Sequence, residues 1–502
     1  MNCGNNMKKL IFFFIIAGIS LGQEIDWFAS YNGSGEESIG HFIIECEDGG
    51  FLQVGETYFF SNSLSTKLYV VKTSSNGTKI WDNEIYIGGH NLGNSVIEST
   101  DGYLIFGGLD RNSSVIKLNK NSGNVIFNKS FDNGGTDAFE NGVQTPNGIV
   151  AVGYINSEDQ NNSFYTEGEG YISFLDYEAN EITSFSISDY ISQAYRVQLF
   201  DNHLYISGLT EEALNYKMLK MSLDGDIIWH HEYGGLGSDH CFAMDMNEQG
   251  EIFLAGHTTS NTENWDVYTI KLNNEGEVLW ENKTGNPRGF NPLYIHDEAW
   301  GIQSTVDGGC VTVAGTGDEY DNYSECNDNV CSDIWSAYII KYDSDGFIVW
   351  EKTFSPLDIG NENYDWAAED IDLTLDGGAI IAIDNGQFGF LKLNNIQNIA
   401  SINKNGDIIL SQFTLGQNYP NPFNPITSIR YDLKNDGLVK IIIYDIAGKV
   451  IKSLVNGTQT SGTKSVHWNS TNDLGEHVSA GLYLYTMQLG ESKKTKKMML
   501  LK

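Results

Sequence analysis

Acidic and aromatic side chains gather between residues 294 and 370, and they are the strongest candidates for chemistry. The candidate ligand residues are Asp297, Glu298, Trp300, Asp318, Glu319, Asp365, Trp366, Glu369 and Asp370. Clustered carboxylates repel one another unless a cation or a shared proton relieves the repulsion. Oxygen ligands without His or thiol favour Ca²⁺ over transition metals, and aromatic rings beside carboxylates can hold a sugar. The pattern predicts a calcium or glycan site; the alternative is a solvated acidic surface around core tryptophans.

Motifs for catalysis are missing from the sequence. It contains no His-Glu-x-x-His, no Gly-x-Ser-x-Gly, no phosphate loop and no dinucleotide fingerprint. We therefore assign no catalytic residue and favour a binding or scaffold protein that recognises a glycan or another extracellular ligand. A secreted polysaccharide hydrolase or lyase that uses carboxylates of the same region is the alternative, because the separation of two carboxyl groups cannot be read from sequence.

The charge of the chain narrows the choice of partner. Acids outnumber bases 66 to 30, a formal net charge of −36. From Phe413 onward there are 11 Lys and Arg against 6 Asp and Glu, a net of +5, so the rest of the chain carries −41. A nucleic acid is held by clustered Lys and Arg, so the acidic body argues against a nucleic-acid partner.

The N-terminus has the order of a secretory signal peptide. Lys8 and Lys9 precede an apolar run, Leu10 to Ile19, and small residues follow. We predict a signal peptide over 1–22 and a secreted protein. No other apolar run approaches the length of a transmembrane segment. In an oxidising compartment Cys326 and Cys331 are close enough in sequence to form a disulfide, with two free thiols as the alternative. Cys46, Cys241 and Cys310 fit small core positions.

One four-strand unit recurs along the acidic body, and it must position the candidate residues. Its first hairpin carries a turn signal at Asp48-Gly49-Gly50, Asp101-Gly102, Asn147-Gly148, Asp201-Asn202, Gln249-Gly250, Asp307-Gly308-Gly309 and Asp376-Gly377-Gly378. Its third strand ends in a lysine at Lys72, Lys117, Lys220, Lys271, Lys341 and Lys392. Its fourth strand ends in an aromatic residue at Trp81, Phe127, Phe185, Trp229, Trp280 and Trp350. We expect these lysines and aromatics to pack between units, with the lysine head outward.

The count of strands predicts a closed ring. Seven sets of first to third strands have only six closing strands after them, and Ile25-Asp26-Trp27 copies the closing pattern before any unit begins. The N-terminal strand would therefore complete the last sheet, which removes an exposed sheet edge. We predict an all-β chain with a seven-bladed β-propeller over 24–394; six or eight blades are the alternatives, because the unit at 138–185 is degenerate. The repeat resembles that of secreted bacterial β-propellers.

Long insertions fall on one face of the predicted propeller. They span 56–66, 154–170, 281–297, 316–334 and 351–365, whereas the turns of the other face are short. Sites usually lie on long loops over a rigid scaffold. We therefore expect the acidic and aromatic candidates to converge from loops of the last two blades.

The basic tail carries the most specific motifs. It opens with Tyr419-Pro420-Asn421-Pro422-Phe423-Asn424-Pro425, continues through Gly448, Gly481 and Tyr483, and ends in a lysine-rich strand with Lys497 and Lys502. Short alternating strands such as 440–444 and 482–485 favour a small immunoglobulin-like sandwich. Over about its last 88 residues the chain resembles the C-terminal sorting domain of the type IX (Por) secretion system.

That resemblance implies a domain arrangement and a partner. Residues 415–502 would be the sorting domain, read by the type IX secretion machinery, and 395–414 would be the linker in which it is removed. The mature propeller would then lie on the cell surface or outside the cell.

Overall fold

The computed structural model describes residues 24–59, 65–157, 168–210, 215–289, 292–293, 295–318, 335–359, 365–396, 401–402, 408–409, 413–415, 418, 423–433, 436–445, 448–489 and 492–501. The predicted signal peptide, Glu319, the predicted Cys326–Cys331 disulfide and Lys502 lie outside these ranges. So do four residues of the tail motif, Tyr419, Pro420, Asn421 and Pro422.

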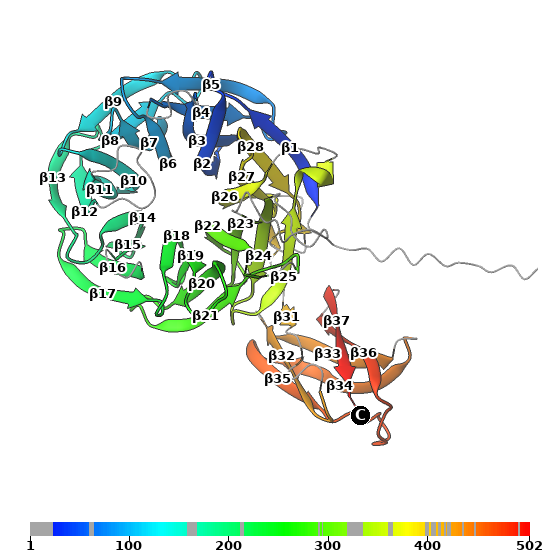
Figure 1. Cartoon of the computed structure of the whole chain (residues 1–502). Helices are drawn as coiled ribbons and strands as arrows, with labels where there is room; N and C mark the ends of the chain where they lie inside the picture. The colour runs from blue at the N-terminus through cyan, green and yellow to red at the C-terminus, as the bar shows by residue number, and fades with distance from the viewer. Residues whose placement is uncertain are drawn as a thin grey trace, which may run out of the picture.

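A ring of seven four-stranded antiparallel sheets forms the acidic body, as a β-propeller (Figure 1). The first strand of each sheet lies nearest the centre of the ring. The first three sheets consist of β2 (Glu37–Glu45), β3 (Phe51–Tyr58), β4 (Lys67–Thr73) and β5 (Lys79–Ile85); β6 (Leu92–Ser99), β7 (Gly102–Leu109), β8 (Asn112–Leu118) and β9 (Val125–Phe131); and β10 (Thr136–Thr145), β11 (Gly148–Ser157), β12 (Glu169–Leu175) and β13 (Glu181–Ser186).

The remaining four sheets continue around the ring. They consist of β14 (Gln193–Phe200), β15 (His203–Leu209), β16 (Tyr216–Ser222) and β17 (Ile227–Tyr233); β18 (Asp239–Met246), β19 (Ile252–Thr258), β20 (Asp266–Leu272) and β21 (Val278–Thr284); β22 (His296–Ser304), β23 (Cys310–Gly317), β24 (Ser336–Tyr342) and β25 (Ile348–Phe354); and β26 (Ala367–Leu373), β27 (Ala379–Asp384), β28 (Phe388–Leu393) and β1 (Ile25–Tyr31). A short 3-10 helix, η2 (Pro356–Ile359), follows β25.

The two ends of the acidic body meet in the last sheet. β1 pairs antiparallel with β28, with Phe28 opposite Leu391 and Tyr31 opposite Phe388. The ring of Phe28 also stacks on Trp366, with 4.5 Å between the ring centroids. The predicted closure by the N-terminal strand is confirmed, and it covers the strand edge that β28 would otherwise expose.

The repeat lysines are not oriented as predicted. Five of the six ammonium groups lie against an acidic residue of the first hairpin in the same sheet: Lys72 Nζ, for example, lies 2.9 Å from Asp48 Oδ1, and its side chain is 1% exposed. The exception is Lys220, which lies 3.5 Å from Glu275 in the next sheet. The Asp48 carboxylate also accepts a hydrogen bond from Gly50 N at 2.9 Å. One carboxylate therefore holds both the turn and the buried lysine, which explains why Asp-Gly-Gly and lysine recur together. A buried ammonium needs such a partner because its desolvation is costly.

The closing tryptophans pack between sheets, as predicted. Trp81 Nε1 donates to Lys120 O in the next sheet at 3.1 Å, and Trp280 Nε1 donates to Ser344 O at 3.1 Å. The ring of Trp81 lies over Gly123, where any Cβ would approach the ring to 2.4 Å and where φ is +68°. Only glycine suits that turn on both counts.

The cysteines of the strands are core residues, as expected. Cys46, Cys241 and Cys310 are all buried and carry free thiols. Burial raises the pKa of Cys241 and of Cys310 to about 12, so both thiols stay protonated at neutral pH.

The tail folds as a small β-sandwich. Its sheets are β31 (Phe413–Leu415), β32 (Thr427–Leu433) and β35 (Gly462–Trp468), packed on β33 (Gly437–Asp445), β34 (Val450–Gln459), β36 (Gly481–Leu489) and β37 (Ser492–Leu500). A two-stranded sheet of β29 (Ser401–Ile402) and β30 (Ile408–Ile409) lies before them in the chain. Phe413, Trp468 and Tyr485 are fully buried in the sandwich core, so its first strand begins within the predicted linker. No helix among the described residues has the length and apolarity to span a membrane.

Candidate functional site in the central channel

The seven inner strands line the central channel, and each has a β-bulge at the same place. In β2 the register with β3 shifts between Gly40 and Phe42, so His41 is the extra residue. The equivalent extra residues in β6, β10, β14, β18, β22 and β26 are Asn94, Glu140, Tyr195, Phe242, Trp300 and Glu369. A bulge bends a strand and re-aims its side chain. Here the device is repeated once in every sheet.

These seven bulge residues meet across the channel and form what we call the septum. Together with Arg196 they surround a space of only about 30 Å³, close to the volume that one water molecule takes in the liquid. On one side of the septum the aromatic rings are in contact: Phe242 stacks on Trp300 at 4.4 Å and meets Tyr195 edge-on at 4.9 Å. The septum therefore leaves little open space at this level of the channel.

The polar half of the septum is strongly desolvated. Burial raises the pKa of Glu140 to about 7, against the attraction of Arg196. Burial and the neighbouring acids Asp384, Glu298 and Asp370 raise the pKa of Glu369 well above its usual range. Burial lowers the pKa of His41 to about 4. At neutral pH the septum is therefore less charged than its composition indicates.

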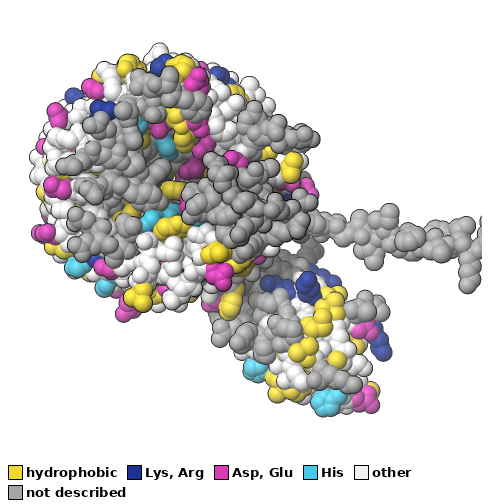
Figure 2. All heavy atoms as spheres, in the orientation of Figure 1, with side chains coloured by type: hydrophobic (Ala, Val, Ile, Leu, Met, Phe, Trp, Pro, Cys, Tyr) yellow, Lys and Arg dark blue, Asp and Glu magenta, His cyan; other side chains and the backbone are white. Residues whose placement is uncertain are grey.

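On one side of the septum the channel widens into a cavity of about 500 Å³, which we call the cup. Its lining residues come from all seven inner strands, from the ends that lead into the short hairpins. The polar ones are Glu45, Glu98, Asn141, Arg196, Gln198, Asp245, Gln303, Asp370 and Asp372. The cup therefore lies at the end of the channel opposite the predicted long loops. Figure 2 shows the ring in space-filling form, with acidic and histidine side chains near its centre.

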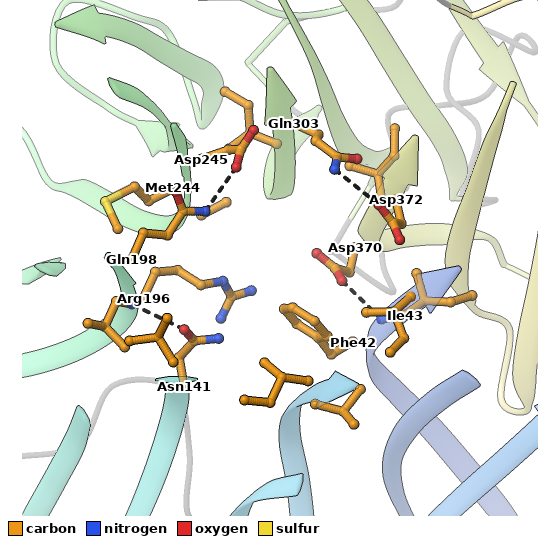
Figure 3. A pocket seen from close by; sticks show the side chains of 18 of the residues that line it. Phe42, Ile43, Asn141, Arg196, Gln198, Met244, Asp245, Gln303, Asp370 and Asp372 are labelled. Carbon is orange, nitrogen blue, oxygen red and sulfur yellow. Dashed lines mark hydrogen bonds between the residues drawn. The ribbon is translucent and has the colours of Figure 1, made fainter. Parts of the chain in front are cut away.

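Carboxylates of the cup join neighbouring sheets. Asp370 Oδ2 accepts a hydrogen bond from Ile43 N at 3.0 Å (Figure 3), and Asp372 Oδ2 accepts one from Glu45 N at 2.7 Å. Both bonds link the last sheet to the first. Inner strands are sheet edges with unpaired N–H groups, and buried N–H groups need acceptors. The carboxylates of the cup are these acceptors, and the hydrogen bonds fix the carboxylates in position.

Arg196 is the basic residue that lines the cup. Figure 3 shows its side chain reaching toward the middle of the cavity, between Asn141 and Asp370. Its guanidinium lies 5.3 Å from the centroid of the Phe42 ring, and Nη1 donates to Tyr195 O at 3.2 Å. In the described part of the chain it forms no ion pair within 4.0 Å.

Burial raises the pKa of Asp370 to about 7, opposed by Arg196. Burial, together with the nearby carboxylates Glu45 and Asp245, raises the pKa of Asp372 to about 6. A cation that enters the cup would therefore stabilise the charged form of both carboxyl groups.

The structure does not gather the predicted acidic residues into one site. Asp297 lies in β22 rather than in a loop, it is fully buried, and its Oδ2 accepts from Asn286 N at 2.6 Å. Asp137 and Asp239 hold the same position in their sheets and accept from Asn133 N and Gly235 N, both at 2.7 Å. Asp297 is thus a repeated structural cap. Burial raises its pKa to about 7.

The other candidates near the channel also have separate roles. Asp318 and Asp297 both lie near the partly buried Arg288 and attract it electrostatically. Asp365 Oδ1 accepts from Trp335 N at 2.9 Å, and Trp366 is a core residue at 1% exposure. Glu298 lies 3.3 Å from His296 Nδ1.

Three candidates do reach the channel, from strands rather than loops. Trp300 and Glu369 belong to the septum and Asp370 to the cup. Within the described residues no three His, Cys, Asp or Glu side chains are placed to hold a metal ion.

Sequence reasoning missed the septum and Arg196. The sequence carries only a partial signal for the septum. In each sheet, the residue three positions before the bulge residue lies at or next to the start of the inner strand. These starting residues are Ser38, Asn91, Asp137, Ser192, Asp239, Asp297 and Trp366. Their differing chemistry hides the repeat, since only three are aspartates.

Comparison with known proteins supports the tail assignment at the level of its fold. Residues 427–493 match the model of the FlgD Ig-like domain. A comparison with curated proteins gave no match.

Solved structures give distant similarities. PorZ, a bacterial surface component of the type IX secretion system of Porphyromonas gingivalis, is 11% identical with a TM-score of 0.43; the alignment covers 94% of this chain and 61% of PorZ. A catalytically inactive virginiamycin B lyase from Staphylococcus aureus with quinupristin is 13% identical with a TM-score of 0.45, covering 73% and 99% of the two chains. Sqt1 from Chaetomium thermophilum is 9% identical with a TM-score of 0.42, covering 72% and 96%. The assignment made from the strands themselves is a β-propeller followed by an immunoglobulin-like domain.

Proposed function

We propose that this protein is an exported, extracellular binding protein that holds a glycan or another polar ligand in the cup of a seven-bladed β-propeller. The observation that carries the proposal is the cup itself. Its volume of about 500 Å³ lies in the range of small-molecule sites. Such sites combine apolar side chains with polar groups that are fixed in position, and the cup has both, with a larger polar share.

The fixed carboxylates favour binding over catalysis. Asp370 and Asp372 each accept a backbone N–H of the next sheet, and Asp245 accepts Ser304 N at 2.7 Å. Groups held in this way orient a ligand without moving. A hydrolase or lyase remains the alternative, with Asp370 as its proton donor, because a carboxyl with a pKa of about 7 can hold a proton at neutral pH.

Export through the type IX route is the second part of the proposal. It divides the chain into a signal peptide (1–22), a propeller (24–394), a linker (395–414) and a sorting domain (415–502). Phe423 of the tail motif supports this part of the proposal. Its side chain is buried against Trp468, with 5.6 Å between the ring centroids, and its backbone forms an isolated β-bridge with Leu500 in the last strand. The opening motif and the terminal strand therefore depend on each other.

Other motif residues shape the sandwich. Gly448 has φ +79° in a turn that Asp445 closes by accepting Lys449 N at 2.9 Å, and Tyr483 donates to Ser479 O at 2.6 Å. Asn424, Pro425 and Lys497 are exposed, which leaves them accessible to the secretion machinery. Gly481 has φ +153°.

The experiment uses the purified chain without residues 1–22 on a glycan array, followed by product analysis of each bound glycan. Ile97→Trp fills the cup, in whose wall Ile97 lies, and Ile80→Trp places the same side chain on the exposed outer strand β5, where Ile80 is 54% exposed. We expect binding that Ile97→Trp abolishes and Ile80→Trp preserves. Equal binding by both variants contradicts a site in the cup, and cleaved products favour the enzyme.

A further inference from the structure

We propose that the group bound in the cup is zwitterionic, with a carboxylate held by Arg196 and an ammonium held by the carboxylates across the cavity. This inference rests on the proposed function, and it names the chemical class of the ligand.

The first step of the argument is the state of Arg196. A guanidinium has five N–H donors, and toward the described residues Arg196 uses one of them, on Tyr195 O at 3.2 Å. It is partly buried, and its other contact is the face of Phe42. A desolvated guanidinium with open donors is best satisfied by a carboxylate, which can accept two parallel N–H bonds.

The second step is the excess of negative charge opposite. Glu98 is paired with Lys120 at 2.8 Å, whereas Glu45, Asp245, Asp370 and Asp372 have no cation within 4.0 Å among the described residues. Their hydrogen bonds come from backbone N–H groups and amides. Neutral donors position a carboxylate but do not cancel its charge. An ammonium in the cup would relieve the repulsion between these four acids.

The third step compares ligand classes. A purely anionic ligand would meet Arg196 but would be repelled by four carboxylates. A purely cationic ligand would leave the guanidinium donors of Arg196 unused. A molecule that carries both charges satisfies both sides of the cup. Apolar side chains lie between the charged groups, among them Ile44, Met244 and Ile302, and they suit an aliphatic segment joining the two charges.

The test is isothermal titration calorimetry of the chain without residues 1–22. Glycine, 4-aminobutyrate and 6-aminohexanoate are compared with hexanoate and hexylamine. We expect at least one amino acid to bind about tenfold more tightly than both single-charge compounds. The chain length that binds best reports the spacing between Arg196 and the acids. The same titrations are carried out with the Ile97→Trp variant, and loss of the binding heat in this variant shows that the compounds bind in the cup.

Two variants separate the charges. Arg196→Gln should remove the preference over hexylamine, and Asp372→Asn should remove the preference over hexanoate. Lys129→Gln, on the outer strand β9, removes a cation far from the cup and should change neither preference. If the zwitterions bind no better than the single-charge compounds, or if both cup variants leave the preferences unchanged, the inference is wrong.

The outcome also separates this inference from the proposed function. A neutral glycan that binds wild type and Ile80→Trp but not Ile97→Trp, with no effect of Arg196→Gln, keeps the cup as a binding site and overturns the zwitterion. Array binding that Ile97→Trp leaves intact overturns both.

Discussion

Lys341 Nζ lies 2.9 Å from Asp307 Oδ1, and the lysine side chain is completely buried while the aspartate is 22% exposed. Lys341 also donates to Thr305 Oγ1 at 2.8 Å and to Tyr342 O at 2.6 Å. The ammonium is thus fully coordinated inside the sheet. Lys72, Lys117, Lys271 and Lys392 pair in the same way with an acid of the first hairpin in their own sheet, so five of the seven sheets close that hairpin with an ion pair.

Removing the acid of this pair should be costly. Asp307→Ala leaves a buried ammonium without its counter-ion, and we expect a loss of about 3–5 kcal/mol in the free energy of unfolding, measured by urea denaturation. Asp101→Ala is the matched control: Asp101 is 70% exposed, and its partner Lys117 is 11% exposed. In Asp101→Ala the loss in the free energy of unfolding should stay below about 1 kcal/mol. Equal losses in the two variants would show that burial of the pair does not matter.

Deleting the closing strand should destabilise the whole ring. Removal of residues 23–31 strips β1 from the last sheet and exposes β28 as an edge. It also uncovers Trp366, on which Phe28 stacks. We expect the Tm to fall by roughly 10 °C or more, since each 1 kcal/mol lost shifts the Tm of a large domain by about 2–4 °C. Truncation of residues 1–22 alone is the control, and a shared Tm for both proteins would contradict closure.

Two acids predicted to bind calcium should prove structural. Asp297→Ala and Asp370→Ala each remove the acceptor of a backbone N–H, from Asn286 and Ile43, at a cost of about 1–3 kcal/mol. Thermal melts in calcium and in EDTA should show the same loss. Asp365→Ala, at an exposed site, should change stability by less than about 0.5 kcal/mol. A loss confined to the calcium buffer would restore the metal hypothesis.

Stability should rise as the pH falls from 8 to 6.5. Folding raises the pKa of Glu140, Asp297 and Asp370 to about 7, so in this window the folded state binds more protons than the unfolded state. The stability linked to these groups is fully present below their unfolded pKa and is lost as the pH rises through 7.

Below pH 6.5 the histidines oppose this gain. Burial lowers the pKa of His41 and His240 to about 4, so unfolded histidines take up protons that the folded ones do not, and stability is lost as the pH falls toward 4. Urea midpoints at pH 8, 7.25 and 6.5 measure the first effect, and Glu140→Gln should flatten it. A midpoint that falls on going from pH 8 to 6.5 would contradict the desolvation of these carboxyls.

Sorting should depend on the terminal strand. Deletion of residues 496–502 removes part of β37, together with Leu500, which bridges to Phe423. If this domain directs type IX export, the truncated protein should accumulate in the periplasm, as detected by fractionation and surface proteolysis. Lys449→Ala, at an exposed turn, should be displayed normally. Normal surface display of the truncated protein would refute the sorting assignment.

The fold could be predicted because its signals are local and repeated. Asp-Gly-Gly turns and closing tryptophans mark each unit, and Ile25-Asp26-Trp27 stands out as a closing strand without a sheet. The orientation of the lysines could not be predicted in the same way. A lysine such as Lys72 is equally compatible with an outward head and with a buried ion pair until the position of Asp48 is known.

The site could be predicted only in part, because side-chain direction in the channel depends on the bulges. A strand alternates its faces with a period of two, and one extra residue reverses that alternation. Trp300, Glu369 and Asp370 were singled out as loop residues for their chemistry. Their real neighbours, such as Arg196 and Glu140, lie in other sheets more than a hundred residues away, and the sequence does not bring them together.

The seven bulges also bear on how this channel can change over time. The backbone repeats one geometry around the axis, whereas the side chains read His, Asn, Glu, Tyr, Phe, Trp and Glu in ring order. Each position belongs to a separate sheet, so a mutation can change one septum side chain without changing the strand that carries another. The septum therefore consists of seven side chains that can vary in type while the backbone that carries them stays the same. Proteins with the same bulged backbone can present different sets of side chains to the channel.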